Sequence, residues 1–122
     1  SHPWLATGHP DPDCTQLREL VRALDALVCH DDQCVFYDYC SLPQQPRNEW
    51  EEALFQYQLR GMRKLYVAKC SHVLVSPNVS ALAASNRPYI ERGWCYFEFT
   101  LAAQHDLICN CDQVKELLQN LP

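Results

Sequence analysis

The chain has 122 residues, of which 48% are hydrophobic and 20% are charged, and its formal net charge is −5. These values predict one globular domain, residues 1–122, and exclude a disordered chain. The acidic balance, without a Lys- or Arg-rich stripe, argues against a nucleic-acid partner. No apolar run reaches the length of about 20 residues that a bilayer requires, and no signal-like start is visible. We therefore expect a cytoplasmic protein without a membrane partner.

The first half of the chain predicts a helix, a strand and a loop. Residues 13–29 form an amphipathic helix, because apolar residues recur at helical spacing after an Asp-containing turn. Its apolar stripe consists of Leu17, Leu20, Val21, Leu24, Leu27 and Val28. Residues 34–38 are typical of a short buried strand. The proline-punctuated segment from Tyr39 to Asn48 is a loop that is too long to be only a connector.

The second half continues the alternation. Residues 49–69 carry two apolar stripes, and Gly61 in their middle predicts a division into two helices. Further predicted elements are a strand at 72–76, a loop at 77–88, a helix at 91–105, a strand at 107–110 and a final helix capped by Asp112. Strands separated by helices predict the α/β class, with a parallel sheet and helices on both faces. Ligands of such sheets bind beyond the carboxyl ends of the strands, where Asp38 and Ser76 fall.

Eight cysteines in so short a chain raise a choice between disulfides, a metal site and reduced thiols. Five of them lie in or beside predicted core elements, where cysteine acts as a small hydrophobe: Cys14, Cys29, Cys70, Cys95 and Cys109. Two closely spaced groups raise the question of a metal site: Cys29 and His30 with Cys34, and Cys109 with Cys111. Neither has the C-x-x-C spacing that structural zinc sites usually show. We predict reduced thiols, with no metal and no cofactor.

Trp94 and Glu98 are the most informative pair in the chain. Their i, i+4 spacing on a helix places an aromatic ring and a carboxylate on one face, which indicates a candidate site. Each has an alternative interpretation: Trp94 as a core aromatic, and Glu98 as an exposed charge or the partner of Arg92. Asp38 could equally cap the turn that follows its strand.

Three motifs in order resemble the Toll/interleukin receptor (TIR) domain family: Val35 to Asp38 before a loop, Ser71 to Asn78, and Tyr89 with Arg92 to Glu98. The chain is also similar to the related heterokaryon-incompatibility domains, whose Asp, Cys and Gln signature is echoed by Asp38, Cys40 and Gln44. The resemblance implies a flavodoxin-like parallel sheet. The first strand of that fold is missing or truncated here: either the chain is a fragment, or Trp4 to Ala6 forms a stub in its place. The loop after Asp38 also lacks the family's common glycine.

The resemblance implies one of two functions. The first is NAD glycohydrolase activity that cleaves the nicotinamide-ribose bond, with NAD as substrate and Glu98 as the catalytic carboxylate. Residues that would bind the substrate are Trp94, Tyr37, Asp38, Tyr39 and Ser76. The alternative is a non-catalytic signalling module that acts by self-association or partner binding. In either case the family resemblance points to the loop from Tyr39 to Asn48 as the self-association surface.

Overall fold

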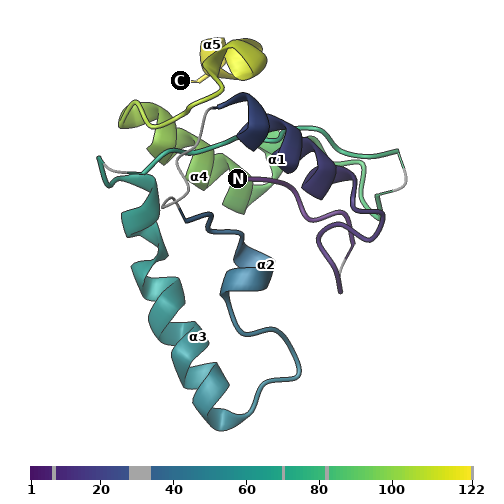
Figure 1. Ribbon diagram of the computed structural model, residues 1–122, viewed down its shortest axis with the longest axis vertical. Coiled ribbons are helices and arrows are strands. Elements are labelled where there is room, and N and C mark those ends of the chain that lie inside the picture. Colours follow the sequence, from purple (N-terminus) through teal and green to yellow (C-terminus); the bar gives the residue numbers. More distant parts are fainter. Residues whose placement is uncertain (7, 28–33, 70, 82, 122) are drawn as a thin grey trace.

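The computed structural model describes residues 1–6, 8–27, 34–69, 71–81 and 83–121. Regular structure in this part of the chain is helical. In chain order the elements are α1 (Thr15–Ala26), α2 (Asp38–Ser41), α3 (Glu49–Gly61), η1 (Met62–Tyr66), η2 (Tyr89–Glu91), α4 (Gly93–Gln104), η3 (Cys111–Val114) and α5 (Lys115–Gln119), where η marks 3₁₀ helices. Figure 1 shows α3 extending away from α1, α4 and α5.

The predicted flavodoxin-like parallel sheet is wrong for the described residues, which contain no strand. What forms in its place is one isolated parallel bridge between Val73 and Ile108. The backbone N–H of Val73 donates to Leu107 O at 2.7 Å, and the N–H of Cys109 donates to Val73 O at 3.1 Å. The two segments therefore run parallel to each other, as predicted, but only this one residue pair forms a bridge.

Asn110 explains why this pairing ends. Its side-chain amide accepts a hydrogen bond from Val75 N at 3.0 Å and donates one to Val75 O at 2.7 Å. Both backbone groups of Val75 are buried and must be satisfied. Because the amide takes the place of a neighbouring peptide group, the backbone needs no further strand partner here.

Residues 34–38 do not form the second predicted strand either. The carbonyl of Tyr37 accepts hydrogen bonds from the backbone N–H groups of Cys40 and Ser41, at 3.0 and 2.8 Å, and α2 begins at Asp38. Val35 and Phe36 are 52% and 41% exposed, so this apolar run is not the buried centre of a sheet. The missing partner strands remove the burial that would have favoured an extended backbone.

Helix α4 lies at the centre of the hydrophobic core. Phe99 and Ala102 are fully buried on it, and Val75 and Val114 pack into the same cluster with 2% exposure each. The predicted helix at 91–105 is thus confirmed as η2 followed by α4. The core collects α4, η1, the bridge residues and the C-terminal helices around one apolar centre.

Helices also form at the other predicted places, but in different surroundings. The predicted cap of the final helix is wrong, because Asp112 lies within η3 and caps neither η3 nor α5. Helix α1 forms within 13–29, but its apolar stripe does not face a core: Leu17 and Val21 are 47% and 48% exposed. The predicted break at Gly61 is correct, because α3 ends there and η1 follows. None of the helices in the described ranges is long and apolar enough to cross a membrane.

The cysteines divide by burial. Cys95 is buried on α4, whereas Cys14, Cys34, Cys40 and Cys111 are exposed thiols. The core-like setting expected for Cys14 is therefore wrong. The predictions for Cys29 and Cys70 concern residues outside the described part of the chain. Burial raises the pKa of the Cys95 thiol to about 11, so its thiolate form is scarce near neutral pH.

Candidate functional site

Glu98 is buried beneath the N-terminal segment, with 5% of its surface exposed. The Ser1 hydroxyl donates to Glu98 Oε2 at 2.5 Å, and the Tyr89 hydroxyl donates to Ser1 Oγ at 2.8 Å. The Tyr66 hydroxyl also hydrogen-bonds to the Glu98 carboxylate. We call this group, Glu98, Ser1, Tyr66 and Tyr89, the Glu98 cluster. It joins α4, η1 and η2 to the start of the chain.

Burial raises the pKa of Glu98 above its ordinary value. Hydrogen bonds from Ser1 and Tyr66 oppose this shift, and the charge of Asp38 adds to it. Burial likewise raises the pKa values of Tyr66 and Tyr89, so both hydroxyls remain protonated donors. The cluster is therefore a buried acid held by hydroxyl donors, and it can carry a proton at a higher pH than an exposed glutamate.

The N-terminal segment is positioned over this cluster by backbone and side-chain hydrogen bonds. Ser76 N donates to Ser1 O at 2.9 Å. The stub strand expected at Trp4 to Ala6 does not form, because the N–H groups of Leu5 and Ala6 donate back to Pro10 and His9 in a local turn. The Arg92 guanidinium donates to three backbone carbonyls, those of Trp4, Ser85 and Arg87, at 2.8 to 3.0 Å. Arg92 is thus occupied with the backbone, and the predicted alternative of an Arg92–Glu98 pair is not what the structure presents.

Asp38 lies under the same segment. Its Oδ2 accepts a hydrogen bond from Trp4 Nε1 at 2.8 Å, and its Oδ1 accepts one from the Tyr39 backbone at 2.7 Å. His2 Nε2 lies 3.6 Å from Asp38 Oδ1. Burial lowers the pKa of His2, so the imidazole is neutral near pH 7 and this separation is a polar contact and not an ion pair.

The predicted aromatic residues pack against the N-terminal segment. The ring of Tyr37 stacks on His2 with centroids 4.5 Å apart, and burial raises the pKa of Tyr37 to about 12. Tyr39 contacts Trp4 edge-on at 5.8 Å and His9 at 4.6 Å. Both tyrosines are therefore engaged within the chain, where they hold the segment in place.

Trp94 and Ser76 are directed elsewhere. Trp94 is 48% exposed and its ring contacts Phe97 at a centroid distance of 5.7 Å, so the expected plate beside a buried Glu98 is not assembled by these contacts. Ser76 Oγ donates to Glu19 Oε2 of α1 at 2.9 Å. The structure thus brings Glu98 and Asp38 under the N-terminal segment and leaves Trp94 apart from them. Ser76 adjoins that segment through its backbone N–H, while its side chain contacts α1.

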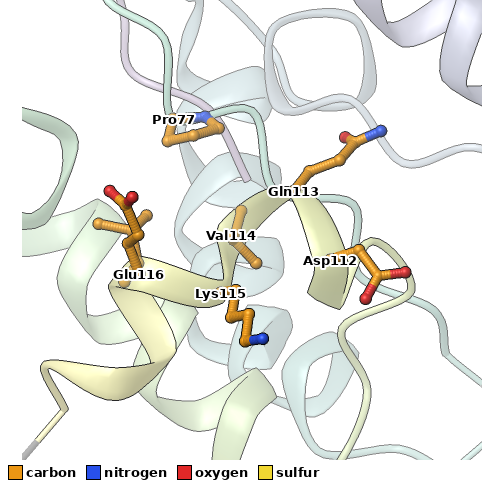
Figure 2. Close-up of a pocket in the computed structure, with 7 residues that line it drawn as sticks. Pro77, Asp112, Gln113, Val114, Lys115 and Glu116 are labelled. Carbon is orange, nitrogen blue, oxygen red and sulfur yellow. The ribbon is translucent and has the colours of Figure 1, made fainter.

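Two of the hollows on the described surface are not lined by any predicted site residue. One, of about 550 Å³, lies between Pro77 and residues 112–117, where the side chains come from η3 and α5 (Figure 2). The other, of about 250 Å³, lies between the end of α1 and residues 109–113. Among the described residues no group of His, Cys, Asp and Glu is arranged to hold a metal ion.

Sequence reasoning missed four residues that build the site. Ser1 carried no signal, and Tyr66 counted only as part of an apolar stripe in the predicted helical segment 49–69. Tyr89 and Arg92 belonged to the motif that carries the family resemblance, and Arg92 was weighed only as an ion-pair partner. Comparisons with protein-family models, with curated proteins and with solved structures each gave no match.

Proposed function

We propose that this chain is a non-catalytic interaction module that acts by self-association. The observation that carries this proposal is helix α3, a helix of 13 residues with no buried residue among them. Two large aromatic side chains on it, Trp50 and Tyr57, are 70% and 78% exposed. Exposed aromatic residues on a helix that packs against little else are typical of a contact surface for another protein.

The local structure holds α3 ready for such a contact. Its N-terminus has a complete capping box, in which Asn48 accepts from Glu51 N and Glu51 accepts from Asn48 N, each at 2.9 Å. Isolated helices of this length are marginal in water, and the cap offsets part of the cost of ordering. A helix that is already formed loses less entropy when a partner binds.

The end of the loop from Tyr39 to Asn48, which was expected to mediate association, contacts α3 through the side chain of Arg47. The Arg47 guanidinium lies over the Phe55 ring at 3.7 Å and contacts Glu52 at 3.4 Å. Tyr39, at the other end of the loop, is packed against Trp4 and His9. These contacts support a shift of the expected association surface from the start of the loop to its end and to α3.

Light scattering coupled to size-exclusion chromatography tests the proposal. We expect the mean mass of the wild-type chain to rise with loading concentration over the micromolar to millimolar range. A constant monomer mass over the whole range would contradict self-association.

A second candidate is cleavage of NAD at Glu98, favoured by the position of two carboxylates beneath the N-terminal segment, where Ser1 donates to Glu98 and Trp4 donates to Asp38. Nicotinamide leaves a cationic pyridinium as a neutral molecule, so one carboxylate could suffice to stabilise the developing ribosyl cation. Against it, Glu98 is covered by the N-terminal segment and its charged form is disfavoured by burial. Release of free nicotinamide by concentrated wild-type protein, and its loss in Glu98→Gln, would support the enzyme.

The pH dependence of stability tests whether Glu98 titrates in its buried setting. A raised pKa in the folded state means that stability is largest below the unfolded pKa of about 4.3 and falls as the pH rises through the folded pKa. Glu98→Gln removes this titration but retains an acceptor. We expect the variant to gain stability relative to wild type between pH 4 and pH 8, as measured by urea unfolding. An equal difference at both ends of that range would contradict a buried, titrating Glu98.

A further inference from the structure

Helix α3 presents one continuous exposed face. Trp50, Ala53, Tyr57 and Arg60 follow one another at spacings of three and four residues, which aligns them along the helix, and all four are exposed. The face alternates a large ring, a small side chain, a second large ring and a cation. Its two ends therefore differ in shape and charge.

We propose that this face pairs with the same face of a second copy of the chain, with the two α3 helices antiparallel. This inference rests on the self-association proposed above and names its geometry. A two-fold axis near the middle of α3 would place Ala53 opposite Tyr57 of the partner subunit, so that the small side chain makes room for the ring. It would also place Trp50 opposite Arg60 of the partner subunit, a pairing suited to a cation–π contact.

The charges of α3 favour the antiparallel orientation. Acidic residues occupy its first turn, and basic residues occupy its last turn and η1: Glu49, Glu51 and Glu52, then Arg60, Arg63 and Lys64. An antiparallel pair places the acidic start of each helix beside the basic end of the other, and a parallel pair would place like charges together. Glu49 and Arg63 flank the exposed face and would meet across the interface.

The expected interface is small. Thirteen residues at a rise of about 1.5 Å give a contact about 20 Å long. Two single helices that touch over this length bury less surface area than a standard stable interface. The association is therefore weak and dependent on concentration. Such an interface suits a module whose assembly is triggered when copies are brought together.

Sedimentation velocity of the whole chain tests the surface. We expect Trp50→Ala and Tyr57→Ala each to raise the dissociation constant by about tenfold or more, because a few buried aromatic side chains usually carry most of the binding energy of an interface. Leu17→Ala is the matched control, since Leu17 is an exposed apolar residue of α1 at 47% exposure, and it should leave the constant unchanged. Circular dichroism checks that each variant is folded.

The possible outcomes distinguish failure of the proposed α3 surface from failure of self-association itself. Association of the wild type that Trp50→Ala and Tyr57→Ala leave unchanged would overturn the α3 surface while self-association stands. A wild type that stays monomeric at every concentration would overturn both.

A charge exchange tests the orientation. We expect Glu49→Arg alone and Arg63→Glu alone each to weaken association by about fivefold, because each creates two like-charge contacts in the symmetric pair. The double variant should restore the wild-type constant. A parallel pair predicts no rescue by the double variant, and that result would overturn the antiparallel geometry.

Discussion

Helices α3 and α4 have 13 and 12 residues and opposite surroundings. Helix α4 buries Cys95, Glu98, Phe99 and Ala102, whereas α3 buries none of its residues. Both helices carry aromatic side chains, so apolar content alone does not decide where a helix lies. Helix α4 is thus held by packing on several sides, whereas α3 touches the core through the half-buried Leu59 and is supported at its other end by its cap and by the adjoining loop.

The largest contrast between the two helices is expected from truncation in α4. Phe99→Ala removes a side chain with no exposed surface, and we expect it to lower the free energy of unfolding by about 3 to 5 kcal/mol. Urea denaturation followed by circular dichroism measures this. A loss below about 1 kcal/mol would show that the core around α4 is loosely packed.

Arg92, which precedes α4, is expected to have the next largest effect. Arg92→Lys cannot reproduce three directed hydrogen bonds to separate carbonyls, so we expect a loss of about 2 kcal/mol. The same denaturation experiment applies. If Lys supports wild-type stability, charge at this position and not the planar guanidinium holds the N-terminal segment.

In α3 the cap is the feature to remove. Asn48→Ala breaks the capping box and should cost about 1 kcal/mol of helix stability. Amide hydrogen exchange across residues 49–61 should accelerate in the variant, while exchange in α4 stays constant. Equal acceleration in both helices would mean that α3 unfolds only together with the core.

The smallest effect is expected for the exposed face of α3. Tyr57→Ala should change the unfolding free energy of dilute, monomeric protein by no more than about 0.5 kcal/mol, because the ring is 78% exposed. The measurement is again urea denaturation, carried out at low protein concentration. A loss as large as that of Phe99→Ala would place Tyr57 inside the fold and remove it as a contact residue.

Sequence periodicity located the three longest helices but not α2, which forms where a strand and a loop were predicted. The boundaries of α1, α3 and α4 fall within the predicted helical ranges, and Gly61 marks the break after α3 as expected. These features depend on local spacing, capping and glycine, which the sequence carries directly. Glu98 was likewise singled out by its place on the helix that follows residue 91.

Only the tertiary structure decided what the apolar runs at 34–38, 72–76 and 107–110 would do. A strand exists through its partners, and the Asn110 amide takes the place of one beside Val75. Burial of Glu98 under Ser1 depends in the same way on contacts between residues 97 positions apart. The longer helices could thus be predicted because they form from neighbouring residues, whereas strand pairing and the burial of Glu98 depend on residues that are far apart in the chain.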